Sequence, residues 1–479
     1  MDRNTLRALA SACALIPLTA PAADDLQALR EEIAQLKKTY EARIAALEAK
    51  LKQVESPPAP AIQSSSPVTS KNAFNPQLSL ILDGVYFRDN KKGASVEMFD
   101  MIDGINHSHG HQGHAHGQLE RGFNLRETEL AFSATVSPHF DAWAMMTVSD
   151  QGDVALEEAY FDTRSLPSGL TVRAGKFLSG IGYLNAQHPH QWDFVDQNLA
   201  YRTLLGEHGL SDTGLRLSWL PKTGSWYTQL GLELLQGKEQ TFATSGLATP
   251  TSREDGAPLA ATSAGALAAQ KAGPRLTTLY AKLGPDLGAN HALQFGGWLA
   301  HARQHQEVHD HTLEDPASPV QALEGKGRAW GLDAVWKYAA GGYGGQGDFK
   351  LVGEYLRLHK NLKIAFDEGG TQVGEKRDFV QDGLVLQGVY GFLPHWQAGL
   401  RYDATGLTKN EVRGPNGKLA EWNKSDRWTL ALTKQIDHFS LFRLQFGRAR
   451  LWNEGVEEKA NQLYLQYQMS LGAHGAHSF

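Results

Sequence analysis

The chain has 479 residues, with 46 lysines and arginines against 52 aspartates and glutamates, so its formal net charge is −6. This balance argues against a nucleic-acid partner. Its one cysteine, Cys13, lies in the N-terminal leader, which fits a mature chain that works in an oxidising compartment. A lipid-attachment role for Cys13 is the alternative, which the short stretch before it disfavours.

The first 22 residues have the three-part pattern of a secretory signal peptide. Arg3 and Arg7 precede the apolar run 8–18, and small residues at 20–22 offer a cleavage site. The apolar run is too short to stay in a membrane as an anchor. We therefore predict that residues 1–22 are removed on export.

Residues 24–55 are predicted to form a helix with a coiled-coil seam. Leu29, Ile33 and Leu36 follow spacings of four and three, and the pattern resumes later after one shift in phase. Because no core lies nearby, burying this seam requires partner helices; a single solvated helix is the alternative. The proline- and serine-rich stretch 56–72 indicates an extended linker. Together they predict a stalk in the periplasm.

From Leu78 onward, apolar and polar residues alternate, as in Leu463, Leu465 and Tyr467 with Gln466 and Gln468 between and after them. Tryptophans near the ends of these stretches, mostly on the apolar face, favour a membrane barrel over a soluble sandwich. We therefore predict an all-β fold, a transmembrane antiparallel β-barrel of about 16 strands over residues 73–479. The predicted strands are 78–88, 121–136, 140–149, 153–163, 169–177, 209–220, 225–236, 273–284, 290–301, 327–339, 347–359, 380–392, 395–406, 425–436, 439–449 and 461–472.

The connections between these strands are of two kinds. Those near Pro138 and Pro394 are short, whereas 89–120, 237–271, 302–325 and 407–423 are long. Short periplasmic turns and long outer loops are typical of bacterial outer-membrane barrels.

The chain ends in an aromatic residue, Phe479, on the parity of the apolar row 463–471. We interpret Phe479 as an assembly signal for the outer membrane.

Two stretches carry a family resemblance. LEEAYFDTRSLPSGLTVRAGKF at 156–177, followed by LSGIGYLNAQHPHQWDFVD, resembles the phosphate-selective porin O and P family of outer-membrane proteins. FNPQLSLILDGVYF and SLGAHGAHSF resemble a histidine-rich branch of such barrels, commonly labelled a zinc-regulated outer-membrane receptor and sometimes TonB-dependent.

The resemblance implies a 16-stranded trimeric porin and an association with zinc. Gly180-Ile181-Gly182-Tyr183 stands where the family more usually has Pro-Phe-Gly, so phosphate selectivity is not carried over. TonB-dependent receptors need about 22 strands and a plug domain. The coiled coil and linker are too short and elongated for a plug, so we do not expect that mechanism.

The loop after the first strand contains five histidines among small and polar residues. Imidazole suits Zn²⁺ and similar ions, and the glycines let the loop wrap around one. We therefore predict zinc, or another divalent transition metal, as the cofactor; a merely solvated loop is the alternative. These residues are His107, His109, His111, His114 and His116.

A second histidine group falls in the predicted outer loop 302–325 and just before it, where Glu307 and Asp310 could join it. Its members are His301, His305, His309 and His311. The segment 178–208 is long enough to fold into the lumen as a constriction, where it could offer a cation site or could only pack. Its polar candidates are His188, His190, Asp193 and Asp196.

Parity places a mixed set of charges in the lumen with a slight positive surplus, which keeps an anion porin as an alternative. The basic members are Arg173, Arg216, Lys337, Arg401, Arg427 and Arg443, and the acidic ones Glu129, Glu233, Asp333 and Asp403. Because Glu157 and Glu158 are adjacent, they are predicted to point to opposite faces, one of them into the pore.

No enzyme motif is present, so we do not expect an enzyme. The leading prediction is an outer-membrane porin-like channel whose histidine-rich loops bind zinc and assist its uptake. The alternatives are a general or anion-preferring, phosphate-type porin, and a structural tether from the outer membrane to the cell wall. The expected partners are outer-membrane lipid, two further copies in a trimer, and the cell wall through the stalk.

Overall fold

β-strands make up most of the described part of the chain. The computed structural model describes residues 77–91, 102, 104–105, 119–150, 152–239, 241–248, 265–309, 320–453 and 455–472. The predicted signal peptide, coiled coil and linker, and Phe479, lie outside these residues. Within them, no helix combines the length and the apolar character needed to cross a membrane.

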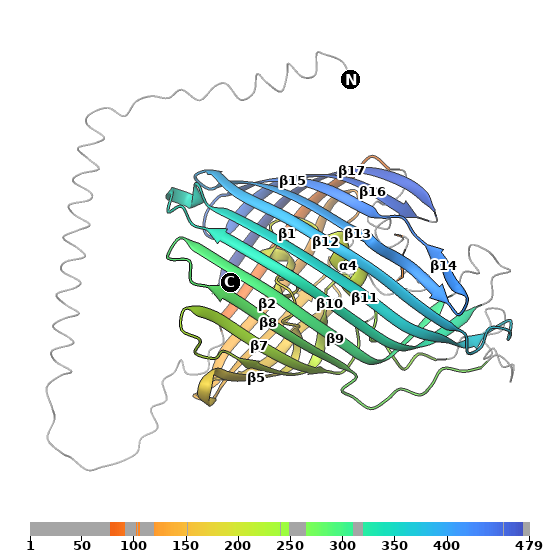
Figure 1. Cartoon of the computed structure of the whole chain (residues 1–479). Coiled ribbons are helices and arrows are strands. Elements are labelled where there is room, and N and C mark those ends of the chain that lie inside the picture. Colours follow the sequence, from red (N-terminus) through yellow and green to blue (C-terminus); the bar gives the residue numbers. More distant parts are fainter. Residues whose placement is uncertain are drawn as a thin grey trace, which may run out of the picture. The chain divides into compact units, whose positions relative to one another are not determined.

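Each strand is joined to the next along the chain (Figure 1). The strands are β1 Gln77–Asp89, β2 Gly122–Ser137, β3 Phe140–Val148, β4 Val154–Thr163, β5 Leu170–Leu178, β6 Ser211–Trp219, β7 Trp226–Leu235, β8 Leu276–Pro285, β9 His291–His309, β10 Gln321–Tyr338, β11 Phe349–Asp367, β12 Lys376–Leu393, β13 Trp396–Gly414, β14 Gly417–Glu421, β15 Ser425–Gln435, β16 Ser440–Asn453 and β17 Val456–Gly472. The helical elements are η1 Pro167–Gly169, η2 Leu184–Ala186, η3 Pro189–Gln191, α4 Leu199–Leu205 and η4 Tyr343–Gly345.

The sheet closes on itself. β1 pairs antiparallel with β2 on one side and with β17 on the other, in a register that runs from Ser79↔Gly472 to Asp89↔Gln462. β14 is a short hairpin strand on β13, and β13 also pairs directly with β15. Leaving β14 out of the 17 described strands gives a ring of 16. The predicted all-β barrel of about 16 strands is therefore confirmed.

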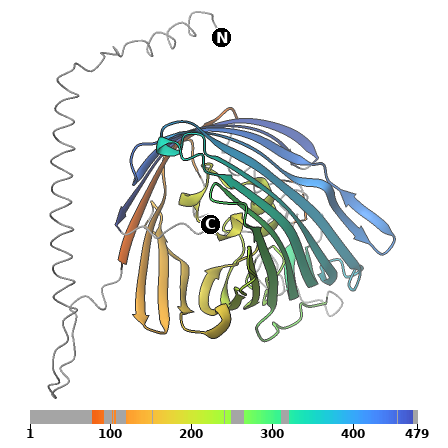
Figure 2. The ribbon, with the colours of Figure 1, turned by 60° about the vertical axis from the view of Figure 1, so that its left-hand side comes forward.

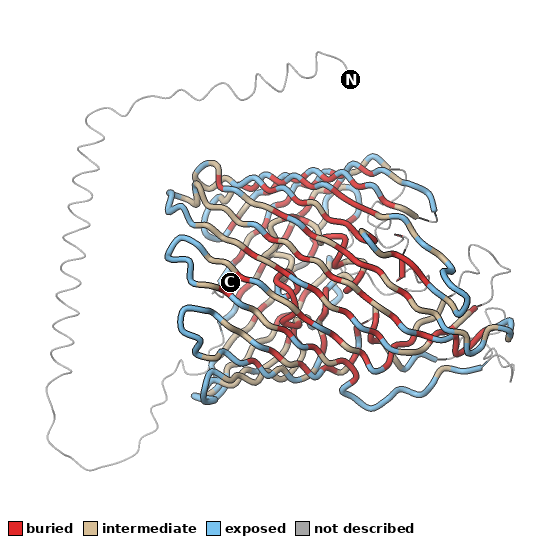
Figure 3. Tube along the Cα trace, in the orientation of Figure 1, coloured by how far each residue is buried: buried red, intermediate tan, exposed pale blue. Residues whose placement is uncertain are grey.

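Alternate residues of each strand face opposite environments, and buried and exposed positions alternate along the traces (Figure 3). On β15, Trp428 and Leu430 are 54% and 57% exposed, whereas their neighbours Arg427 and Thr429 are buried. An apolar outer surface around a polar interior is the reverse of a soluble protein, and is typical of barrels that cross a bilayer.

The two ends of the barrel differ. Short connections such as 138–139 and 394–395 join strands at one end, which we call the turn end, and the long ones lie at the other, the loop end. β9 and β11 have 19 residues each, whereas β5 has nine.

These long strands correct the predicted loops. The stretches 302–325 and 407–423 are largely strand, because β9 and β13 continue to His309 and Gly414 and β10 begins at Gln321. Their pairing persists beyond the apolar belt, where both faces are polar and the alternation no longer marks a strand.

Substitution of two similarly exposed leucines tests whether the apolar outer surface of the barrel faces lipid. Leu430 lies on β15 between Leu400 and Phe446, and Leu419 lies on the hairpin strand β14 at the loop end. We expect Leu430→Arg to lower the free energy of unfolding in lipid vesicles by about 2–4 kcal/mol, because the guanidinium would face hydrocarbon. Leu419→Arg should change it by less than about 0.5 kcal/mol. Equal costs for both, measured by urea unfolding, would contradict a membrane belt at β15.

Candidate functional site

The connection between β5 and β6 runs inside the ring (Figures 1 and 2). We call residues 179–210 the inner segment. It contains η2, η3 and α4, and Asn198 caps α4 by accepting a hydrogen bond from the Tyr201 backbone N–H (2.9 Å). The segment predicted to fold into the lumen does so.

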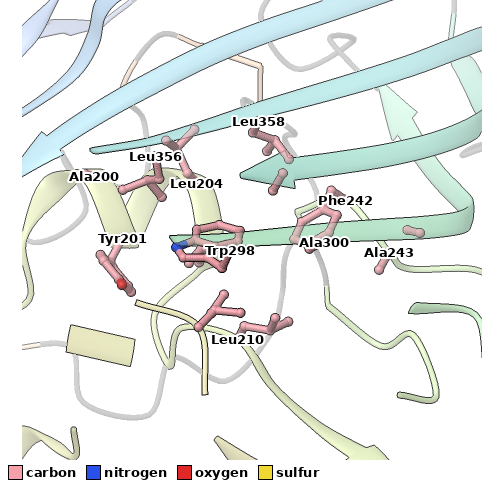
Figure 4. Close-up of a cluster of buried hydrophobic side chains, with 14 of the residues drawn as sticks. Ala200, Tyr201, Leu204, Leu210, Phe242, Ala243, Trp298, Ala300, Leu356 and Leu358 are labelled. Atoms are coloured by element: carbon pink, nitrogen blue, oxygen red, sulfur yellow. The ribbon is translucent and has the colours of Figure 1, made fainter. Parts of the chain in front are cut away.

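One side of the inner segment is apolar and packs against the barrel wall. Leu204 of α4 belongs to a buried cluster with Trp298 of β9, Leu358 of β11 and Phe242 from the connection between β7 and β8 (Figure 4). The wall admits α4 this closely because β12 has a glycine there: a Cβ at Gly383 would lie 2.6 Å from the Cβ of Ala200. This part of the lumen is a packed core.

The other side of the inner segment is polar, and Asp196 is its main anchor. Its carboxylate accepts hydrogen bonds from Arg401 Nη2 (2.8 Å) and Gln445 Nε2 (2.7 Å), and it forms an ion pair with Arg427. Arg427 also donates to Asp403 of the wall (Nε to Oδ1, 3.2 Å). The four charged groups compensate one another where water is largely excluded.

Burial alone would raise the pKa of Asp196, but Arg427 and Arg401 outweigh it and lower that pKa from 3.8 to about 2. A group whose pKa is lowered on folding contributes stability above its ordinary value and loses it as the pH falls through the lowered one. Asp196 therefore holds the inner segment through mildly acidic conditions.

Two further carboxylates connect the inner segment to β11 and β12. Asp193 accepts from Lys350 Nζ (2.5 Å) and Gln387 Nε2 (2.9 Å). Glu354 of the wall accepts from the backbone N–H of Tyr183 (2.8 Å) and from the Tyr201 hydroxyl (2.6 Å). The carboxylates Asp193 and Asp196, candidates for a cation site in the sequence, are thus bound by basic wall residues, which leaves no uncompensated negative charge for a cation.

The two histidines of the inner segment meet the opposite wall. His188 Nε2 lies 3.1 Å from Glu158 Oε2 on β4, and His190 Nδ1 lies 2.7 Å from Glu129 Oε2 on β2. The two imidazole rings are stacked, with centroids 5.9 Å apart and planes 1° from parallel. All four side chains are at most 12% exposed.

Glu157 and Glu158 both face the lumen, which corrects the predicted opposite orientations. The pairing of β3 with β4 shifts between Met145↔Glu158 and Met146↔Leu156, so Glu157 is the extra residue of a β-bulge. Its Oε1 accepts from Thr147 Oγ1 (3.3 Å), an inward residue of β3.

Two cavities adjoin the inner segment. A vestibule of about 1130 Å³ lies on its turn-end side, between it and residues such as Ser225 and Asp286 of the turns. A much smaller cavity of about 60 Å³ lies between the inner segment and Glu129, Thr147 and Glu157 of the wall. The aqueous space is therefore wide towards the turns and narrow beside β2, β3 and β4.

The predicted lumen charges face inward. Arg173, Arg216, Lys337 and Arg443 line the vestibule. Arg401, Arg427 and Asp403 are buried against the inner segment, and Glu129, Glu233 and Asp333 are also buried. Arg173 pairs with Asp162 (2.8 Å) and Arg216 with Glu233 (2.7 Å), partners on neighbouring strands.

The second histidine group is only partly brought together. His305 and His309 each contact one oxygen of Glu307, at 2.9 and 2.8 Å, and Lys360 Nζ contacts the same carboxylate at 2.6 Å. His301 pairs in register with Thr277 and Arg328 instead, away from Glu307.

The lysine already supplies the positive charge that a metal would bring to Glu307. In the described ranges, no three His, Cys, Asp or Glu side chains are arranged to hold a metal ion. His311 and Asp310 fall outside those ranges, as do His107, His109, His111, His114 and His116.

The residues that flank the first histidine group are described, and they are buried. The Ile105 backbone N–H donates to Gln381 Oε1 (3.2 Å), and its carbonyl accepts from Lys360. Leu119 packs with Val195 of the inner segment. Residues 105 and 119 therefore both lie inside the barrel.

Sequence reasoning missed several residues of the site. Glu158, Lys350 and Glu354 face the inner segment, and Glu129 was recognised only as a lumen residue. The alternation of inward and outward residues along β11 could have identified Lys350 and Glu354 as lumen residues. For Glu158 this alternation is interrupted by the β-bulge.

No family model matches the chain. A protein of Aquifex aeolicus (strain VF5), described as an uncharacterized protein, is 33% identical over 414 residues, which are 86% of this chain and 81% of that protein. Among solved structures, an anion-selective porin from Comamonas acidovorans is 12% identical with a TM-score of 0.47, over 83% of this chain and 99% of that one. OmpT, an outer membrane protein of Vibrio cholerae, is 9% identical with a TM-score of 0.46, over 85% and 100%. At these low TM-scores the structural similarity gives no information about which solute this protein would transport.

Asp196 tests the anchoring of the inner segment. We expect Asp196→Asn to lower the free energy of unfolding by about 3–5 kcal/mol, because Arg401 and Arg427 lose a buried counter-charge. Asp153→Asn, at an exposed position between β3 and β4, should change it by less than about 0.5 kcal/mol. Urea unfolding in vesicles measures both, and equal stability of the two variants would contradict the anchoring.

Proposed function

The chain belongs to the family of the Aquifex aeolicus protein, and we propose that it is an outer-membrane channel for small anionic solutes. The closed ring, its apolar outer surface and the water-accessible vestibule support a channel rather than an enzyme. The long connections would face outward and the turn end the periplasm.

The proposed preference for anions rests on the positive charge of the vestibule. Three carboxylates line it, Glu158, Asp193 and Asp286, against six cationic side chains. The cationic residues are Arg173, Arg216, Lys282, Lys337, Lys350 and Arg443.

Two of these cations form no ion pair within 4 Å in the part of the chain that the structure describes. Among the described residues, Lys282 and Arg443 lie in no ion pair; Arg443 donates instead to Thr433, Gln466 and the Trp192 carbonyl. A pore lined by fixed positive charge concentrates anions and repels cations. Phosphate-type anions fit this chemistry.

Lys282 tests this proposal. A unit charge about 8 Å from a permeating ion in water contributes about 0.5 kcal/mol, which is roughly a twofold change in an equilibrium. We expect wild-type protein in planar bilayers to prefer chloride over potassium, and Lys282→Gln to lower that permeability ratio about twofold at low salt. Lys222→Gln, in the exposed connection between β6 and β7, should leave it unchanged. A cation-selective wild type would contradict the proposal, and a barrel that conducts nothing would favour a structural tether.

We also propose that the stretch 107–116 binds zinc. Five imidazoles in ten residues support this, as does the burial of Ile105 and Leu119 on either side of the stretch, within the barrel whose pore it would serve.

Calorimetry tests the zinc site. Changing the five histidines to serine together should remove most of the tight zinc binding while the circular dichroism spectrum stays that of a β-sheet. Wild-type binding should weaken as the pH falls through about 6.5, because protonated imidazole does not bind metal. Equal zinc affinity of the two proteins would show that the stretch is only a solvated loop.

For assembly we propose a homotrimer whose stalks, residues 24–55, pack together in the periplasm. The unpartnered seam of Leu29, Ile33 and Leu36 supports this. The same stalk could contact the cell wall.

A further inference from the structure

Two histidine–glutamate pairs border the two cavities beside the inner segment. His188 lines both the small cavity and the vestibule; Glu129 lines the first, and His190 and Glu158 line the second. The pairs therefore stand where the two cavities adjoin. A solute crossing between the cavities on this side passes them.

The pairs are rigidly held. Gln468 Nε2 donates to the His190 carbonyl (3.0 Å), and the Leu178 backbone N–H donates to Glu158 Oε1 (2.9 Å). Each imidazole has its own carboxylate, and the rings stack in parallel. The four side chains act as one unit whose charge depends only on its bound protons.

The charged groups around this unit come from β1, β2, β4, β5, β11, β16 and the inner segment. Most are already paired: Arg126 with Asp83, Arg173 with Asp162, and Asp193 with Lys350. Arg173 also lies over the ring of Tyr160 (3.6 Å). The remaining neighbours are Arg443, Glu157, and His208, which lies 4.0 Å from Glu157.

We propose that His188–Glu158 and His190–Glu129 set the ion preference of the passage between the cavities, and that its preference for anions weakens as the pH rises. When His188 is protonated, its charge compensates the Glu158 carboxylate, and when His188 is neutral the unit carries one more negative charge. The vestibule keeps its positive charge in both protonation states of the unit, so the charge beside the passage is what changes with pH. This inference rests on the proposed channel function and deepens it.

The direction of the change follows from the surroundings of His188. Burial would lower the pKa of this imidazole, but the hydrogen bond and the charge of Glu158 outweigh burial and raise the pKa above 6.5. His188 therefore keeps its proton to a higher pH than an exposed imidazole does, and loses it as the pH rises past the raised pKa. Anion preference is strong on the acidic side of this step and weak on the alkaline side.

Reversal potentials in planar bilayers, measured from pH 5 to pH 9 in a potassium chloride gradient, test the proposal. The wild-type chloride-to-potassium permeability ratio should fall about fivefold or more as the pH rises, since a unit charge at about 4 Å in water changes an equilibrium by that factor. The double variant His188→Gln/His190→Gln should show no such step. Its heat-modifiable migration on gels verifies that it is folded.

Two further variants distinguish an effect of the histidine charge on ion preference from a merely structural role of the two histidines. Glu158→Gln should move the midpoint of the step to lower pH, because the carboxylate that holds the proton on His188 is gone. His291→Gln is the matched control: His291 also lines the vestibule, but its contacts are with Trp336 and Tyr338, and the step should persist.

A flat wild-type profile, or an unchanged step in the double variant, overturns the inference and leaves the channel in place. A wild type that conducts at no pH overturns both the inference and the proposed function.

Discussion

A sheet in hydrocarbon has no water to satisfy the backbone groups of its edges, so the barrel depends on the pairing of its first strand with its last. β1 pairs with β17 along nearly its whole length, from Ser79 to Asp89. Closure of the sheet separates the outer surface, which faces lipid and is apolar, from the lumen, which can be polar. The lumen can then hold buried arginines and glutamates, provided that they find partners there.

Those partners come from the inner segment, which divides the lumen into two environments. Against β9, β11 and β12 it is packed as tightly as a soluble core, around Leu204 and Trp298. Ion pairs and hydrogen bonds, with Asp196 at their centre, join it to the remaining wall and to other residues of β11 and β12. Water is left with the vestibule and the narrow passage beside it, so the solute meets only a few of the many charges in the lumen.

The residues of this passage show how far sequence reasoning reached. Parity predicted that Arg401, Arg427 and Glu129 point inward, because side chains of a strand alternate between two faces. It was wrong in predicting that Glu157 and Glu158 point to opposite faces, since a β-bulge adds one residue and both glutamates face the lumen. It also gave no warning that β9 continues to His309, because beyond the bilayer neither face of a strand has to be apolar.

The sequence by itself determined the barrel, its approximate strand number and the face of most residues. These properties follow because successive side chains of a strand point to opposite faces, one towards lipid and the other towards the lumen. Each strand therefore shows this alternation in its own sequence. Only the tertiary structure decided which charges are free to meet a solute. Arg427 and Asp196 neutralise each other although 231 residues separate them, and His188 lies on Glu158 because the inner segment folds back across the lumen. Such pairings depend on closure of the whole ring, and no local pattern records them.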